Sequence, residues 1–187
     1  ALNDHNKIIY SLMQMATMQQ VQSDIVGSEA SATEAIKYFQ KDTHIEYKIT
    51  IYSTLATNFQ NLYDFEEAIK YYQLSLSIAK DAITRINIKN NIAVAYSEKK
   101  EFKKAIALLS EALKQKEVLN YPNTQALLLC NLGNVYRQIG HPSSLEYLKQ
   151  SLEIRKKINN DFSTIASYFH LAEYYEPINS ALAKDYA

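Results

Sequence analysis

Side chains that could support catalysis are few in this sequence, and they are scattered. The four histidines, His5, His44, His141 and His170, fall in different segments and show no metal-ligand spacing. The sequence also lacks a glycine-rich phosphate loop and the serine elbow of hydrolases. The single cysteine, Cys130, has no base or cation beside it in sequence, so a small semi-buried filler is a better interpretation than a reactive thiol. We therefore predict that the chain itself is not an enzyme and uses no cofactor or metal.

Asparagine is the residue type whose placement needs an explanation. Asn is a poor residue for a helix interior, because its side chain competes for backbone hydrogen bonds. A carboxamide carries a donor and an acceptor side by side, which suits the backbone amide of a bound peptide. The alternative is that these side chains bond neighbouring helices or stay hydrated. The asparagines that fall inside segments expected to be helical are Asn87, Asn90, Asn91, Asn131 and Asn134.

Helices are the elements that must position these residues. Three glycines and three prolines in 187 residues are too few for the many turns of a sheet. Twenty basic and twenty acidic side chains cancel, so we expect no contact of this chain with nucleic acid or an anionic membrane. No stretch reaches the roughly eighteen apolar residues of a membrane span. The chain has no initiator Met and ends without a helix cap, so we expect a fragment of a longer protein.

One pattern of large, small and aromatic residues recurs four times. The aromatics Phe59, Tyr96, Tyr136 and Tyr175 follow one another at intervals of 37, 40 and 39 residues. A small residue stands three positions before each aromatic. In the first three repeats a second small residue follows eight or nine positions after the aromatic. Small residues let two antiparallel helices approach, and the aromatics fill the space beside them. The small residues are Ala56, Ala93, Gly133 and Ala172 in the first helices and Ala68, Ala105 and Ser144 in the second.

This order of residues resembles the tetratricopeptide repeat. The resemblance implies an all-α solenoid of about five antiparallel helix pairs in a right-handed superhelix. No Trp opens a repeat, and the intervals exceed the usual period of about 34 residues, which longer helices would explain. The residues that match best are Leu129, Leu132, Gly133 and Tyr136 for a first helix and Ala105, Leu109 and Ala112 for a second.

We expect a single array over residues 1–187, with ten helices, the last one cut short. Residues 1–42 form a divergent first repeat with a long loop that contains Gly27, as is typical of a terminal unit. Residues 43–80, 81–119 and 120–158 form three full repeats, and residues 159–187 form a partial last repeat. Pro122 is expected in a first turn, and Gly140 in the left-handed conformation at a helix end. The expected N-caps or first-turn acids are Asp64, Asp81, Asp161 and Asn179 or Ser180.

The resemblance also implies which residues meet a ligand, since first helices line the concave face of such arrays. In kinesin light chains and bacterial pheromone-peptide receptors, Asn at the positions of Asn91 and Asn131 contacts peptide, and we favour that role here. For Asn87 and Asn90 we favour solvent, and for His170 a hydrogen-bonded role and a functional one stay open. The predicted peptide-binding residues are Thr57, Asn61, Asn91, Asn131, Asn134, Arg137 and His170.

Two classes of function fit these expectations. The last third resembles the arrays of bacterial sensor histidine kinases, and also those of some helix-turn-helix regulators, so we expect the sensor region of a larger signalling protein. The alternative is a stand-alone scaffold or adaptor, and a homodimer is possible. As part of a membrane kinase the chain would lie outside the cytoplasm, and otherwise inside it. The chaperone-tail subgroup is disfavoured, because its carboxylate-binding cations are replaced here by Ser53, Leu127 and Asn131.

Overall fold

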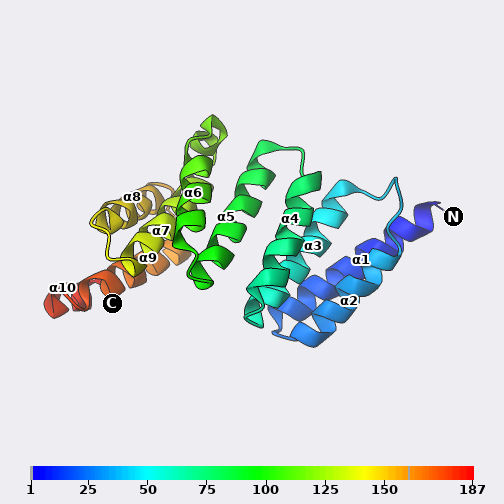
Figure 1. Ribbon diagram of the computed structural model, residues 1–187, viewed down its shortest axis with the longest axis horizontal. Helices are drawn as coiled ribbons and strands as arrows, with labels where there is room; N and C mark the ends of the chain where they lie inside the picture. The colour runs from blue at the N-terminus through cyan, green and yellow to red at the C-terminus, as the bar shows by residue number, and fades with distance from the viewer. Residues whose placement is uncertain (1, 160) are drawn as a thin grey trace. The chain divides into compact units, whose positions relative to one another are not determined.

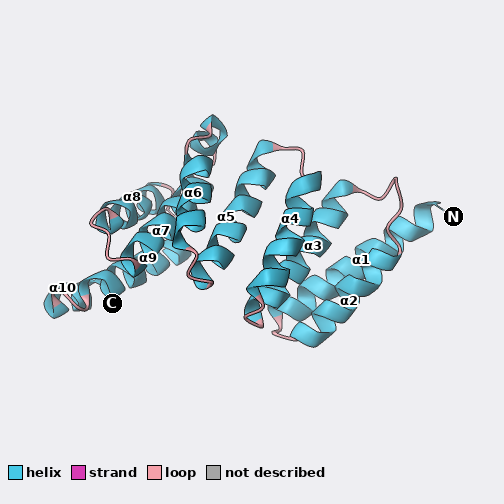
Figure 2. Cartoon of the chain, in the orientation of Figure 1, coloured by secondary structure: helices cyan, strands magenta, loops and turns pink. Residues whose placement is uncertain are grey.

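The computed structural model describes residues 2–159 and 161–187, and these are almost entirely helical (Figure 1). No strand occurs in these two ranges (Figure 2), which confirms the all-α prediction. The chain divides into two compact units, Ala1–Lys99 and Lys100–Ala187, called here the N-terminal and the C-terminal unit.

Five helices build the N-terminal unit, and each packs against the next one in the chain. The first helix also contacts the third, so consecutive helix pairs stack as in a solenoid. The helices are α1 (Leu2–Val21), α2 (Ile25–Lys37), α3 (Ile45–Asn61), α4 (Phe65–Ile78) and α5 (Ala82–Glu98).

The C-terminal unit repeats this arrangement. Its helices again pack in chain order, and α7 also contacts α9. A short 3₁₀ helix, Lys116–Asn120, lies between α6 and α7. The helices are α6 (Phe102–Leu113), α7 (Pro122–Gln138), α8 (Ser144–Lys157), α9 (Asp161–Tyr175) and α10 (Ser180–Tyr186).

The turns that follow α1, α3, α5 and α7 share one backbone conformation. Ser23, Tyr63, Lys100 and Gly140 all have φ between 62° and 67°, in the left-handed region. This conformation ends a helix abruptly, but it strains any residue other than glycine. Gly140 was expected to end its helix in this way, and the structure confirms it.

The first inter-helix turn is shorter than the sequence suggested. Gly27 lies inside α2, and not in a long loop. The reason is Asp24, whose Oδ1 accepts a hydrogen bond from the backbone N–H of Gly27 at 2.9 Å and so starts the helix early.

The other expected helix ends are confirmed where the structure describes them. Asp64, Asp81 and Asn179 each cap the helix that follows, and Pro122 is the first residue of α7. The backbone N–H of Thr84 donates to Asp81, which lowers the pKa of that carboxyl group. The side chain of Asp161 lies outside the described residues.

Close approach within each helix pair depends on small residues and on serine hydroxyls. A Cβ added at Gly133 would lie 2.9 Å from Leu148 side-chain carbons, so α7 and α8 touch there without space for a methyl group. Beside this point the Ser144 hydroxyl donates to the carbonyl of Gly133 at 2.9 Å. The Ser28 hydroxyl donates in the same way to the carbonyl of Ala16 at 2.8 Å. In both units a serine hydroxyl thus bonds the second helix to the first. Because serine is small, the two helices can still pack closely.

Candidate functional site

Polar side chains of α7 and α9 meet in the C-terminal unit. Arg137 Nη2 donates to Glu173 Oε2 at 3.1 Å, and His170 Nδ1 lies 3.1 Å from the same oxygen. The three side chains are only 26–32% exposed. Asn134 stands three residues before Arg137, on the same face of α7. We call Asn134, Arg137, His170 and Glu173 the α7–α9 polar cluster; three of these four belong to the predicted site.

Two atoms of this cluster are buried without a partner. Neither Asn134 Oδ1 nor Arg137 Nε has a hydrogen-bond partner within the described part of the chain. The amide nitrogen of Asn134 lies 4.0 Å from the sulfur of Cys130. A buried group left without a partner typically costs about 1–3 kcal/mol, and most such groups in proteins are satisfied. An acceptor and a donor on one face of α7 therefore both lack a partner inside the described part of the chain.

A second guanidinium group of the C-terminal unit lies on α8. Arg155 of α8 is 5% exposed, and its Nη1 donates to the Ser163 carbonyl and to the Ser167 hydroxyl, both at 2.7 Å. Burial raises the pKa of the neighbouring Cys130 thiol, although the charge of Arg155 opposes the shift. Cys130 is 2% exposed, which agrees with the interpretation of a filler and not of a reactive thiol.

The corresponding face of the N-terminal unit is satisfied internally. Thr57 Oγ1 lies 3.0 Å from the hydroxyl of Tyr72 and donates to the Ser53 carbonyl at 3.0 Å. The Tyr72 hydroxyl also reaches Gln60 Oε1 at 3.4 Å. Tyr72 is 2% exposed, and this burial raises its pKa. Thr57 therefore joins α3 to α4, while Asn61, the last residue of α3, is exposed.

The remaining predicted asparagines differ from one another. Asn90 is 3% exposed, so the expectation that it faces solvent is wrong. Asn90 lies on the buried side of α5, and its amide nitrogen donates to Asn91 Oδ1 at 3.4 Å. Asn91 and Asn131 are half-buried. Asn131, like Asn87 and Asn90, also interacts with other residues of the protein.

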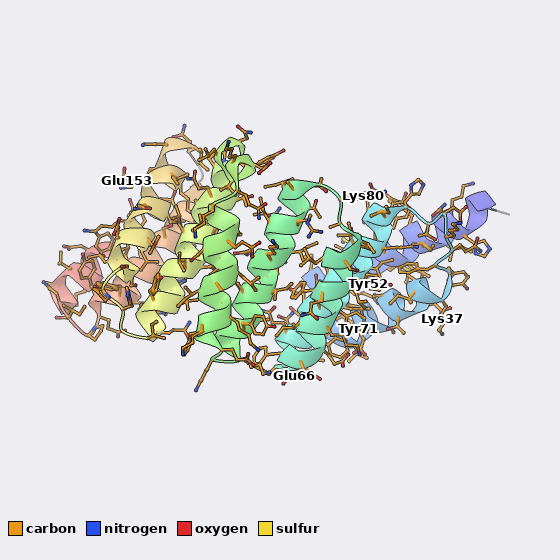
Figure 3. All side chains as sticks on the ribbon, turned by 45° about the horizontal axis from the view of Figure 1, so that its top comes forward. Lys37, Tyr52, Glu66, Tyr71, Lys80 and Glu153 are labelled. Carbon is orange, nitrogen blue, oxygen red and sulfur yellow. The ribbon has the colours of Figure 1, made fainter. Side chains whose placement is uncertain are left out.

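Tyrosines near the surface pack against each other. Tyr71 stacks on Phe59 with ring centroids 5.5 Å apart and 6° between the planes, and Tyr52 lies 6.3 Å from Tyr71 (Figure 3). Phe39 meets Tyr52 edge-on at 5.7 Å. Burial raises the pKa of Tyr52. These rings fill space between helices, as expected from the sequence.

A mostly apolar cavity of about 350 Å³ lies between α9 and α10, and sequence reasoning missed it. Phe169, Ala172 and Ala183 line it, together with Glu173 of the polar cluster. The spacing of Phe169, Ala172 and Glu176 along α9 was the only signal in the sequence. It could not show how far α10 covers this face.

The described ranges contain neither a metal-binding cluster nor a membrane-spanning helix. Residues 2–159 and 161–187 contain no group of three His, Cys, Asp or Glu side chains that could hold a metal ion. None of the helices in these ranges is long and apolar enough to cross a membrane.

Comparison with known proteins places this geometry in a family. The profile described as tetratricopeptide repeat matches residues 47–118 and 84–157. The response regulator aspartate phosphatase E of Bacillus subtilis (strain 168) is 31% identical over 144 residues, which cover 69% of this chain and 38% of the relative.

Two solved structures share the fold at low identity. BtubC (BKLC) from P. vanneervenii superposes with a TM-score of 0.78 at 20% identity, over 98% of this chain and 78% of that one. A Rap protein complexed with competence and sporulation factor superposes with a TM-score of 0.78 at 17% identity, over 95% of this chain and 52% of that one. With the profile matching more than half of its length, the chain belongs to the tetratricopeptide repeat family.

Proposed function

We propose that this chain is the non-catalytic, peptide-binding module of a larger bacterial signalling protein. The observation that carries the proposal is the half-buried polar face of α7 that Asn131, Asn134 and Arg137 form. A bound peptide suits such a face, because each of its residues carries one N–H and one C=O group.

The spacing of these side chains supports an extended ligand. Residues three apart on a helix lie on one face, with Cβ atoms about 5–6 Å apart. Along one edge of an extended peptide, N–H and C=O groups point outward together, so a strand lying across α7 meets the exposed parts of Asn134 and Arg137 at once. Asn131, one turn earlier on α7 and half-buried, extends the same face.

The comparisons support the signalling context. The named relative is a response regulator aspartate phosphatase, and one of the similar structures holds a Rap protein with competence and sporulation factor. From the sequence we expect this chain to be part of a sensor histidine kinase, which also signals through response regulators. The expected kinase and the named relative therefore both belong to two-component signalling. This chain spans 38% of the relative's length, and we assign the phosphatase activity to the relative alone.

A random-sequence peptide pool tests the binding. We expect the immobilised chain to retain peptides from a pool of nonapeptides, detected by mass spectrometry. Asn134→Ala should lower retention roughly tenfold, because it removes an acceptor worth about 1–3 kcal/mol in a partly dry site. The matched control is Gln150→Ala, which removes an exposed amide on α8. Equal retention by the two variants would contradict the proposal.

A further inference from the structure

The outward side of α9 carries the large apolar side chains that a helix ordinarily turns toward the core. Phe162, Ile165 and Phe169 are 86%, 66% and 60% exposed. On the opposite side of the helix Ser167 is 1% exposed, so a polar side chain is buried while apolar ones face solvent. We propose that two copies of this chain associate through this surface, which we call the α9 outer face: Phe162, Ile165, Phe169 and Ala172.

The spacing of the α9 outer face fits a second helix. Its residues follow one another at alternating steps of three and four positions, and Glu176 continues the series after Ala172. This is the spacing of a coiled-coil seam, in which each side chain enters a hole on the facing helix. The seam is apolar along its length and becomes charged only at Glu176. A helix is therefore the element whose shape matches this surface.

The surface carries both a hole and a projecting side chain, so it fits a copy of itself. α9 and α10 pack together at the C-terminal end of the chain (Figure 1), and the cavity of about 350 Å³ between them includes Phe169 and Ala172 in its lining. A cavity of about 150 Å³ already holds a benzene molecule, so a phenyl ring can enter this one. The projecting side chain is Phe162, ten residues before Ala172 on the same helix.

A two-fold arrangement uses both features at once. When two α9 helices pack antiparallel, with the two-fold axis between Ile165 and Phe169, Phe162 of each copy lies opposite Ala172 of the other. Each copy then inserts one ring and receives one, as the contacts of a two-fold interface require.

Charges at the two ends of α9 favour the antiparallel orientation. Before its first turn, α8 ends in the exposed Lys156 and Lys157, and Asp161 offsets only one of them. Lys156 lies over the ring of Tyr168 at 5.5 Å, which leaves Lys157 as the cation for a partner. Glu176 is exposed beyond the other end of the helix. Antiparallel packing brings Glu176 of each copy toward Lys157 of the other, whereas parallel packing would place like charges together.

The exposed apolar area is on the scale that a dimer uses. An aromatic side chain buries roughly 150–250 Å², so Phe162 and Phe169 at their exposed fractions offer about 300 Å² in each copy. A standard interface buries about 800 Å² per partner. Two rings thus supply more than a third of that area, and Ile165, Ala172 and the cavity wall add to it.

The mass of the chain in solution tests the proposal. In sedimentation velocity we expect a dimer of two 21.4 kDa chains that dissociates on dilution. Phe162→Glu should weaken association at least tenfold, because it places a charge in the apolar cavity of the partner. Ala172→Leu, which narrows the hole, should act in the same direction. The matched control is Val26→Glu, which also places a glutamate in the first turn of a helix, at a side chain that is 80% exposed, and should leave association unchanged.

A charge exchange tests the antiparallel orientation. Glu176→Lys and Lys157→Glu should each weaken the dimer a few-fold, because each brings like charges together at two symmetry-related places. The double variant should regain the affinity of the unmodified chain. Lys149→Glu, at an exposed lysine two turns earlier on α8, is the control and should have little effect. A double variant that is weaker than either single variant would overturn the antiparallel arrangement.

Other results would overturn the association itself. A chain that stays monomeric at every concentration would refute it and leave the α9 outer face to a helix of another protein. A dimer that Phe162→Glu and Val26→Glu weaken equally, or that neither weakens, would also refute it, because the copies would then meet elsewhere. Circular dichroism of each variant establishes that it is folded before its mass is compared.

Discussion

The polar faces of α3 and α7 come from equivalent positions of two repeats, yet they differ in how they are satisfied. On α3, Thr57 bonds Tyr72 of the following helix and a carbonyl of its own helix. On α7 the equivalent residue, Asn134, keeps a buried oxygen without a partner. A satisfied network stabilises its helix pair, while an unsatisfied one contributes less to the stability of its pair. The same fold thus supplies one structural face and one candidate binding face.

A bulky substitution at the contact between α7 and α8 should have the largest effect on stability. In the N-terminal unit Ala56 occupies the position of Gly133, so α7 and α8 approach more closely than a methyl group permits. Gly133→Leu should lower the free energy of unfolding by about 3 kcal/mol, at the upper end of the usual cost of overpacking. Chemical denaturation followed by circular dichroism measures this. An unchanged midpoint would show that the helices do not pack at Gly133.

Breaking a satisfied network should have the next largest effect. Asn58 of α3 is 1% exposed; its nitrogen donates to the Ser28 hydroxyl at 2.8 Å, and its oxygen accepts from Gln20 at 2.8 Å. Asn58→Ala removes both of these buried bonds and leaves a cavity, so we expect a loss of about 2 kcal/mol and a lower melting temperature. Thermal unfolding provides the measurement, and a level melting temperature would argue against the network.

The matching change on the unsatisfied face should cost little. Asn134→Ala removes a buried oxygen that has no partner and introduces a better helix former. We expect the melting temperature to stay level or rise slightly, in contrast to Asn58→Ala. A loss as large as that of Asn58→Ala would mean that Asn134 supports the fold, and the difference between the two faces would disappear.

The smallest expected effect concerns the turns. Tyr63 has φ 62°, while Gly140 fills the equivalent turn of the C-terminal unit. Tyr63 is 80% exposed, so Tyr63→Gly removes strain and little packing. We expect a gain of up to about 1 kcal/mol, reduced by the greater freedom of glycine in the unfolded chain. Gly140→Tyr should show the opposite sign in the same denaturation assay.

Residue spacing predicted the helices well, because small residues and aromatics must recur wherever two helices pack closely. The spacing identified Gly133 as a contact point, and capping chemistry identified Asp64, Asp81 and Asn179. Residue spacing could not predict that α2 begins before Gly27, because one local hydrogen bond, from Gly27 to Asp24, decides where this helix starts.

The candidate site was predictable only in part. Asn134, Arg137 and His170 were selected by their register on the first helices, and the structure brings the last two together. Glu173, the carboxylate that joins them, was not selected, because a glutamate in a helix is ordinary in sequence. The burial of Asn90 was also missed, since it depends on which way α5 is rotated. Which polar atoms stay unpartnered depends on packing between helices, and residue spacing does not report it.

The bonds of Arg155 across α8 and α9 have a consequence for how the chain opens. Its guanidinium holds the Ser163 carbonyl in the first turn of α9 and the Ser167 hydroxyl one turn later. In repeat arrays terminal helices ordinarily fray first, because each repeat is stabilised only by its neighbours. A buried side chain that holds the first two turns of α9 makes its opening require the release of α8 as well. The amide hydrogens of α9 should therefore exchange with solvent together with those of α8, while α10 exchanges earlier and on its own.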